Sequence, residues 1–183
     1  MCNKMNNINK LLKIFYEESG REFHIRLLAR LTGLNPNTVI NISKKLNEQD
    51  LIIIKKDKET NKVILRANIG NKIFRLNKQK YNLEKIYKTQ IIDYLNDELA
   101  YPTVVLFGSY AKAENHKNSD IDLFIISDEK KKLNLYKFEK MLRAEIQVFL
   151  HTKNEFTKLK KNSKELINNV INGYVLSGFL EVL

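Results

Sequence analysis

Hydrophobic residues in the first fifty positions recur at helical spacing in three segments that turn signals separate. The first segment, residues 8–16, is followed by Ser19-Gly20, which ends the pattern. A second helix is predicted over residues 25–32, and Gly33 opens a tight turn after it. The third is predicted over residues 36–47, because Asn35 is a favourable N-cap and Pro36 a favourable first helical residue. This is the order of a helix-turn-helix unit.

One side of the predicted third helix is apolar and the other is polar. At about 100° per residue, Val39, Ile42 and Leu46 fall in one sector and are expected to be buried. Asparagine and lysine side chains can pair with base edges in the major groove of DNA. The polar side could also be no more than a solvated surface. The DNA-contacting candidates on this side are Asn37, Thr38, Asn41, Lys44 and Lys45.

Two short β-type runs, at 51–54 and 63–67, surround a polar and net basic segment, residues 55–62. Three helices followed by such a hairpin resemble the winged helix-turn-helix family over about residues 5–68. The resemblance implies that the third helix enters the major groove of double-stranded DNA. It also implies that the hairpin lysines Lys55, Lys56 and Lys58 contact the DNA backbone or the minor groove. A protein-docking role is the alternative, because winged helices also serve in that way.

Charge divides the chain into two unlike halves. The net charge is +11; residues 1–80 carry 17 Lys and Arg against 7 Asp and Glu, and residues 81–183 carry 15 against 14. A basic half next to a nearly neutral one predicts two domains, 1–80 and 81–183, the first facing a polyanion. An A/T-rich coding sequence could supply the lysines, but it does not explain why the acidic residues collect in the second half.

The composition and the lengths of the apolar runs bear on where in the cell the protein lies. The single cysteine, Cys2, excludes a disulfide framework, and no apolar run approaches the ~20 residues of a membrane span. We therefore expect a cytoplasmic protein.

Residues 68–76 and 82–99 are predicted as connecting helices, with Asn82 capping the second.

The second half contains two apolar strands with polar residues where they meet. The β-branched run 103–107 is followed directly by Gly108-Ser109 and the start of a helix, on which Lys112 adds positive charge. Gly108 allows close backbone approach to a ligand, and Ser109 and the following amides can donate to phosphate oxygens. The second strand begins with Asp120 and Asp122, which share one face because side chains alternate along a strand. Two adjacent carboxylates repel unless a cation such as Mg²⁺ lies between them.

The segments Leu-Phe-Gly-Ser-Tyr-Ala-Lys at 106–112 and Ser-Asp-Ile-Asp-Leu at 119–123 resemble the polymerase-β-like nucleotidyltransferase superfamily. They are most similar to its small prokaryotic branch, the minimal nucleotidyltransferases. The resemblance covers about residues 83–152, with an extension to 183. It implies an α+β fold with a mixed sheet, in which Gly108 and Ser109 bind a nucleoside triphosphate such as ATP. Asp120 and Asp122 would then hold Mg²⁺ or Mn²⁺.

One position departs from the family pattern. The family usually carries a third carboxylate on a later strand, which helps to bind metal and to activate the attacking hydroxyl. On the predicted strand 145–150, Gln147 occupies the place expected for that acid, and an amide cannot act as a base. Glu145 lies on the same face two residues earlier and is a candidate substitute; it could equally be a solvated acid at a strand end.

Two further residues, Glu155 and His116, are of types that can take part in catalysis. Thr152 and Glu155 have the spacing of a capping box, so Glu155 is expected to bond backbone. His116 lies in the loop between the two motif segments, where it could touch a substrate.

Two functions remain open from the sequence. In the first, the protein is an enzyme that transfers a nucleoside monophosphate to a hydroxyl of a protein or nucleic acid. Minimal nucleotidyltransferases similar to this one often act as antitoxins that adenylylate a tyrosine of a HEPN-type toxin, so such a partner is expected under this hypothesis. In the second, the protein is a DNA-binding transcription regulator whose nucleotidyltransferase-like domain senses nucleotide or mediates oligomerisation. A homodimer is expected, because winged-helix proteins generally read two half-sites.

Overall fold

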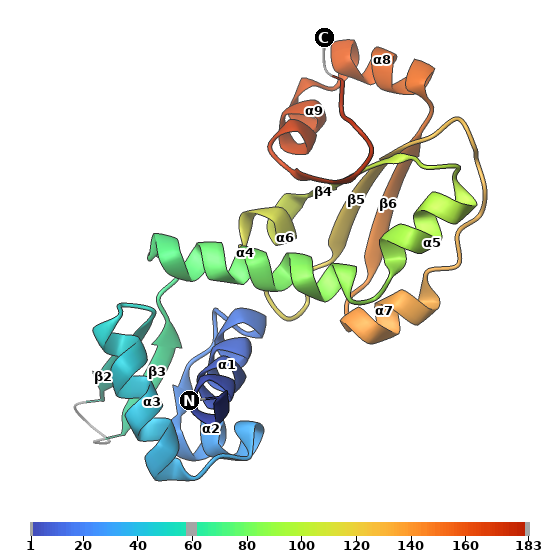
Figure 1. Cartoon of the computed structure of the whole chain (residues 1–183). Helices are drawn as coiled ribbons and strands as arrows, with labels where there is room; N and C mark the ends of the chain where they lie inside the picture. Colours follow the sequence, from blue (N-terminus) through green and yellow to red (C-terminus); the bar gives the residue numbers. More distant parts are fainter. Residues whose placement is uncertain (1, 58–61, 182–183) are drawn as a thin grey trace. The chain divides into compact units, whose positions relative to one another are not determined.

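The computed structural model describes residues 2–57 and 62–181, and its contacts divide the chain into two compact units, Met1–Tyr81 and Asn82–Leu183 (Figure 1). Among the helices of these described residues, none combines the length and the apolar character that a membrane span requires. Each unit has its own hydrophobic core, so each is described separately below.

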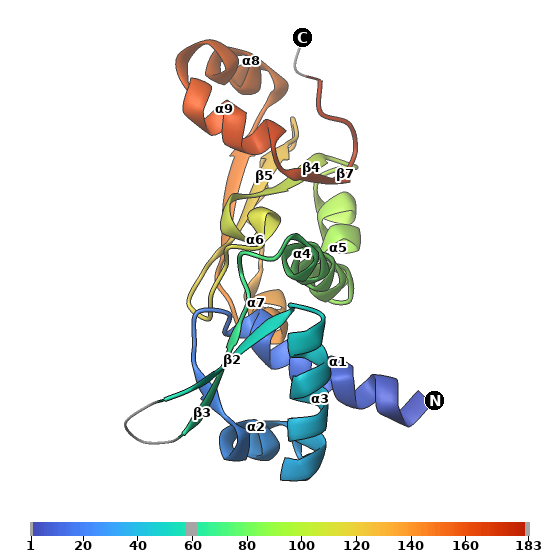
Figure 2. The same cartoon turned by 90° about the vertical axis from the view of Figure 1, so that its left-hand side faces the viewer.

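The first unit is built from three helices and a small antiparallel sheet. In chain order its elements are α1 (Cys2–Glu17), β1 (Phe23–His24), α2 (Ile25–Thr32), α3 (Pro36–Glu48), β2 (Ile52–Lys56) and β3 (Val63–Ala67). The strand order is β1-β3-β2, and β2 pairs with β3 as a hairpin that projects beside the helices (Figure 2). The helices and the hairpin agree with the sequence prediction, whereas β1, only two residues long, was not predicted.

Local signals set the helix-turn-helix segment of this unit. The Asn35 side chain accepts a hydrogen bond from the Asn37 backbone N–H at 2.8 Å, which caps α3 as predicted. Gly33 ends α2 in the left-handed region, with φ of 68°. The predicted apolar stripe of α3 is buried: Val39, Ile42 and Leu46 are at most 6% exposed.

The connection between the two units is one continuous helix, α4 (Lys72–Tyr87), followed by α5 (Ile91–Glu98). The predicted helices at 68–76 and 82–99 are therefore wrong in their bounds, and Asn82 lies inside a helix rather than at its N-terminus. No glycine or proline interrupts residues 71–101, so nothing stops a helix where the cap was predicted. The break comes instead at Gln90, whose φ is 62°.

The second unit is built around a four-stranded mixed sheet of order β6-β5-β4-β7. β5 runs parallel to β6, and β4 runs antiparallel to both β5 and β7. The short β7 was not predicted. The elements of this unit after α5 are β4 (Thr103–Phe107), α6 (Gly108–Lys112), β5 (Ile121–Ile126), α7 (Tyr136–Leu142), β6 (Ile146–His151), α8 (Lys153–Asn162), α9 (Lys164–Ile171) and β7 (Tyr174–Ser177).

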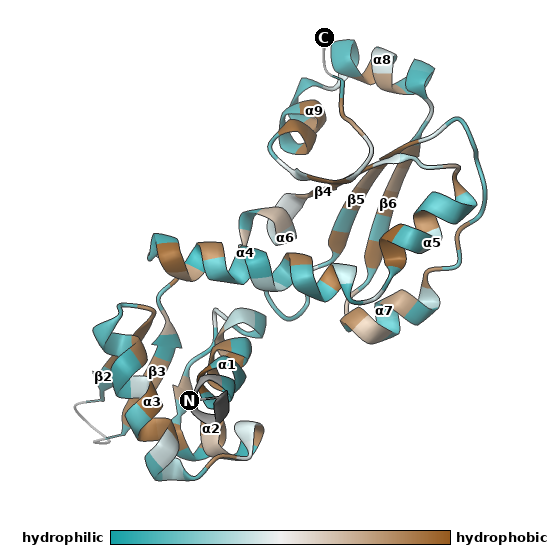
Figure 3. Cartoon of the chain, viewed as in Figure 1, coloured by the Kyte–Doolittle hydropathy of each residue, from teal (hydrophilic) through white to brown (hydrophobic). Residues whose placement is uncertain are grey.

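Helices cover both faces of this sheet, which makes the second unit a three-layer α/β/α arrangement (Figures 1 and 2). Val104 and Leu106 face a core with α5 and α7, and Val105 and Phe107 face another with α8 and α9. The central strands are thus apolar on both faces, and their ribbons are largely brown, the colour of hydrophobic residues, in Figure 3.

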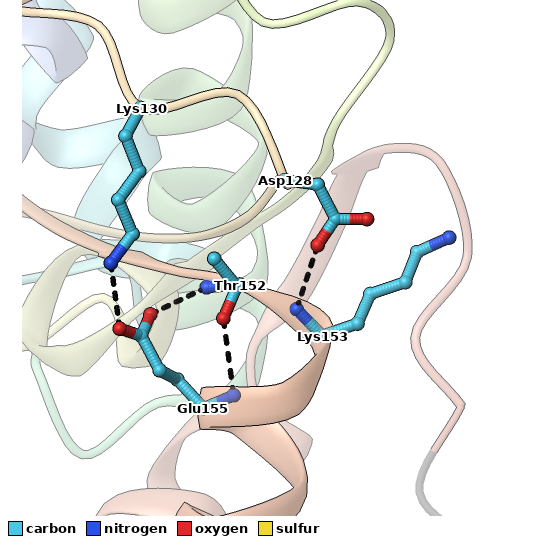
Figure 4. Close-up of polar contacts among 5 residues, drawn as sticks. All are labelled: Asp128, Lys130, Thr152, Lys153 and Glu155. Atoms are coloured by element: carbon cyan, nitrogen blue, oxygen red, sulfur yellow. Dashed lines mark hydrogen bonds and ion pairs between the residues drawn. The ribbon is translucent and has the colours of Figure 1, made fainter.

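The segment after β6 begins α8 with the predicted capping box (Figure 4). Thr152 Oγ1 accepts from the Glu155 backbone N–H at 3.2 Å, and Glu155 Oε2 accepts from the Thr152 N–H at 2.8 Å. Lys130 also donates to Glu155 at 2.6 Å. These hydrogen bonds, the one from Lys130 first, lower the pKa of Glu155 to about 2. Glu155 is engaged as a helix cap, as its spacing predicted.

Candidate active site and nucleic-acid interface

The ends of β4 and β5 bring Gly108 and Asp122 into direct contact. In the antiparallel pair, Phe107 lies opposite Asp122, and Gly108 is the next residue along the chain. Gly108 has φ of 69°, and a Cβ added to it would overlap Asp122 Oδ2 and lie 3.1 Å from Asp122 Cγ. Only glycine fits here, for reasons of both backbone conformation and space. The glycine therefore allows the first helical turn and a carboxylate to share one small region.

Asp120 and Asp122 stand at the beginning of β5, which starts at Ile121. Both side chains are partly exposed. Burial raises the pKa of Asp122, and the negative charge of Asp120 raises that pKa further. This is the mutual repulsion that a bound cation would relieve. Two carboxylates that share a solvent-accessible edge fit a divalent cation whose other ligands are water and phosphate oxygens.

The third position of the cluster is an amide. Gln147 lies opposite Asp122 in the parallel β5–β6 pair, and its Nε2 donates to Asp120 Oδ2 at 2.9 Å. Glu145 precedes β6 and is exposed; its backbone carbonyl accepts from the Ile121 N–H at 2.9 Å. Within the described residues, no three or more His, Cys, Asp or Glu side chains are grouped so that they could hold a metal ion. The aspartate pair thus has an amide as its neighbour.

The α6 turn supplies the other polar groups of the site. Phe107 precedes this turn, and its side chain makes no capping hydrogen bond to it. The Ser109 hydroxyl is partly exposed and makes no hydrogen bond within the described part of the chain. Lys112 is exposed, and its Nζ donates to Asn169 Oδ1 on α9 at 3.3 Å. An uncapped turn with a free hydroxyl suits an anionic group such as a phosphate.

The loop before Asp120 is closed by its own hydrogen bonds. Ser119 Oγ accepts from the His116 backbone N–H at 2.9 Å, and the Ser119 N–H donates to the His116 carbonyl at 3.0 Å. His116 Nδ1 accepts from the Asn118 backbone N–H at 3.3 Å. These bonds engage His116 and Ser119 in the loop that leads into Asp120, so their visible role is to order it.

Sequence reasoning missed two buried asparagines behind this turn, Asn82 and Asn115. Asn82 was predicted to be a helix cap, and no role was predicted for Asn115. They are 2% and 4% exposed and are joined by a hydrogen bond of 2.9 Å. The uninterrupted helical pattern through 71–101 is the signal that could have placed Asn82 inside a helix. No local signal identifies its distant partner.

The predicted DNA-contacting residues lie on two neighbouring elements of the first unit. On α3, Asn37, Asn41, Lys44 and Lys45 are exposed and Thr38 is half-buried. On β2, Lys55 and Lys56 are exposed. Lys58 lies outside the described residues. The described members therefore keep their side chains accessible opposite the buried stripe of α3 and along the hairpin.

The second unit is a domain of helices around a mixed sheet, in which Gly108, Asp120 and Asp122 lie together where β4 ends and β5 begins. Residues 89–178 match the family model "Polymerase beta, Nucleotidyltransferase", so this unit contains a nucleotidyltransferase domain of that family. The matched range includes every predicted catalytic, metal-binding and nucleotide-binding residue and leaves out the first unit.

Two other comparisons add little. No curated protein matches the chain significantly. One solved structure, described as an ICLR transcriptional regulator from Silicibacter sp. TM1040, is 18% identical over 57% of this chain, with a TM-score of 0.32. The match spans 39% of that structure's chain. This similarity is too low to indicate a shared fold.

Proposed function

We propose that the second unit binds a nucleoside triphosphate, ATP as the first candidate, together with Mg²⁺ or Mn²⁺. The observation that supports this most directly is the contact of the Gly108 backbone with Asp122, beside Asp120 and ahead of the uncapped α6 turn. Gly108, Ser109 and Lys112 would face the phosphates, and Asp120 and Asp122 would hold the metal. The bound metal would neutralise phosphate charge.

We further propose that this site transfers a nucleoside monophosphate to a hydroxyl of a protein or nucleic acid. A bond forms between the hydroxyl oxygen and the α-phosphorus, and the bond from that phosphorus to the bridging oxygen breaks, so that pyrophosphate leaves. The Gln147 amide cannot accept the hydroxyl proton, which passes to water or to the carboxylate of Glu145, an exposed acid at the strand end. A tyrosine of a HEPN-type toxin is one acceptor to test.

The test of transfer is incubation with α-³²P-labelled ATP, MgCl₂ and a panel of acceptors that includes duplex DNA, RNA and the chain itself. Wild-type protein should label an acceptor, and Asp120→Asn and Asp122→Asn should lower the rate by at least about 100-fold. Asp97→Asn is the matched control, because Asp97 is an exposed aspartate on α5 of the same unit. Equal labelling by all four proteins would contradict the assignment.

A second candidate, a DNA-binding regulator that senses nucleotide without turnover, is favoured by the Gln147–Asp120 hydrogen bond. An amide at the third position leaves the pair able to hold a metal while removing a base. Under this function, the wild-type chain binds Mg-ATP but labels nothing, and Mg-ATP changes its affinity for duplex DNA. Labelling of any acceptor that depends on Asp120 and Asp122 would exclude it.

For the first unit, we propose that α3 and the β2–β3 hairpin bind double-stranded DNA as a winged helix. The supporting observations are the buried stripe and accessible polar side of α3 and the exposed lysines of β2. The excess of basic residues over 1–80 points the same way. A homodimer would place two such surfaces on two half-sites.

A further inference from the structure

A buried asparagine of α4 is bonded to the turn that carries the proposed nucleotide site. Asn82 is 2% exposed, and its Nδ2 donates to the Tyr110 backbone carbonyl and to Asn115 Oδ1, both at 2.9 Å. Tyr110 belongs to α6, and Asn115 follows α6 in the loop toward Asp120. A buried amide has to be hydrogen-bonded to be tolerated in a core. This pair of bonds fixes α4 to both ends of one short segment, residues 110–115.

The helix α6 is too short to be stable by its own hydrogen bonds, so residues 110–115 need contacts with another part of the unit. It has five residues, and its last residue is followed by Ala113 in the left-handed region, with φ of 56°. The Ser109 carbonyl is occupied by the Glu114 and Asn115 N–H groups, at 2.9 and 3.2 Å. The Tyr110 carbonyl receives the Ala113 N–H only at 3.4 Å, so the Asn82 donor is its shorter bond. One turn of helix is marginal without tertiary contacts.

We infer that Asn82 is a positioning residue of the proposed nucleotide site. It holds the α6 turn in the orientation in which Gly108 meets Asp122 and the Ser109 hydroxyl remains available to phosphate. Asn82 acts through Tyr110 and Asn115 and does not itself touch the ligand. This inference rests on the proposed function for its binding consequence, while its geometric part concerns the ligand-free chain alone.

The test compares Asn82→Ala and the nearly isosteric Asn82→Asp with a control that loses a similar bond elsewhere. Asn96→Ala is that control: Asn96 Oδ1 accepts from Ser177 Oγ at 2.8 Å in the same unit, and neither residue belongs to the site. Thermal unfolding and circular dichroism first establish that each variant is folded. Asn82→Ala serves if Asn82→Asp does not fold, because the buried carboxylate of Asn82→Asp would face the oxygens of Tyr110 and Asn115.

Two measurements follow on the full chain. Hydrogen–deuterium exchange without ligand should show faster exchange of the amides of residues 109–115 in both Asn82 variants, by about tenfold or more, and not in Asn96→Ala. Titration calorimetry with ATP and MgCl₂ should show about tenfold weaker binding for the Asn82 variants and a change below about twofold for Asn96→Ala.

The outcomes separate the two proposals. Unchanged exchange at 109–115 in the Asn82 variants overturns the positioning role, whatever the nucleotide result. Faster exchange with unchanged Mg-ATP affinity also overturns it, because the turn would then not need Asn82 in order to bind. Wild-type protein that binds neither ATP nor GTP with Mg²⁺ overturns the proposed function, and with it the role of Asn82 in binding. Faster exchange together with weaker binding in both Asn82 variants supports the inference.

Discussion

The Gln147 side chain donates a hydrogen bond of 2.9 Å to Asp120 Oδ2, so an amide N–H points at a carboxylate in the proposed metal site. This contact partly compensates the charge of Asp120, beside which Asp122 already has a raised pKa. The hydrogen bond stabilises Asp120 and Asp122 when no metal is bound, but the site has an amide where a third carboxylate could have bound the metal. The site is thereby suited to a metal that arrives with phosphate oxygens as its own additional ligands.

Gln147→Glu is expected to create the missing third carboxylate. Three neighbouring acids repel, so the variant without metal should unfold at a lower temperature than the wild type, and MgCl₂ should restore it. Thermal unfolding with and without MgCl₂ measures this, and metal affinity should increase by roughly tenfold or more. Gln147→Ala, which loses the hydrogen bond without adding charge, is the control. A Gln147→Glu variant with no greater response to Mg²⁺ than Gln147→Ala would contradict the metal site.

Gly108→Ala should cost more stability than the same change at Gly33. Both glycines have positive φ, 69° and 68°, but nothing lies within 4 Å of a Cβ added at Gly33, whereas one at Gly108 meets the Asp122 carboxylate. Gly33→Ala should therefore cost about 1–2 kcal/mol from backbone strain alone. Gly108→Ala should cost more than that and should also abolish Mg-ATP binding. Denaturant unfolding and calorimetry measure both effects; similar costs and intact binding would argue against the close approach.

Asp122 should make the ligand-free chain less stable as the pH rises. Its folded pKa lies above the ordinary value of 3.8, so the folded state binds more protons than the unfolded state between the two values. The free energy of unfolding therefore falls as pH rises through that window and stays lower above it. Asp122→Asn should remove this loss while preventing metal-dependent nucleotide binding. Its unfolding midpoint at pH 7, compared with that of Asp97→Asn, checks the sign.

For Lys78, in the first unit, we expect the opposite pH dependence: the free energy of unfolding should rise as the pH rises. It is completely buried on α4, donates to Ser19 Oγ at 2.8 Å, and burial lowers its pKa from 10.5 to about 8. The folded state then binds fewer protons, so the free energy of unfolding should rise by about 1–2 kcal/mol between pH 7 and 10. Lys78→Met should flatten this slope, and Lys72→Met, on an exposed site of the same helix, should not. Denaturant titrations at several pH values distinguish them.

Lys44→Ala and Asn41→Ala on α3 should weaken binding to duplex DNA. Loss of Lys44 should lower the slope of log affinity against log salt by about one if it contacts phosphate. Asn41→Ala should reduce affinity without that change in slope. Lys13→Ala on α1 is the matched exposed control. Fluorescence anisotropy over a range of salt concentrations makes the comparison, and unchanged affinity in both α3 variants would remove this helix from the interface.

Much of the fold could be predicted because its signals are local. The N-cap at Asn35 and the capping box of Thr152 and Glu155 depend on residues within three positions of one another, and both form as their spacing indicated. The strand Val63–Ala67 is also as predicted, since its boundaries follow from apolar runs between polar segments. The α4 helix was misjudged because a capping residue is equally compatible with a helix interior when its side chain finds a partner elsewhere.

By itself, the sequence determined most of the longer helices and strands, but not the short β1 and β7 or the bounds of α4, and it determined the spacing that places Gly108, Asp120 and Asp122 at strand ends. Those features depend on local propensity and on periods of two and 3.6 residues. The tertiary structure decided which residue completes the aspartate pair and which one secures the α6 turn. Gln147 reaches Asp120 across 27 positions and Asn82 reaches Tyr110 across 28. Contacts over such distances exist only once strand pairing and helix packing have fixed the backbone.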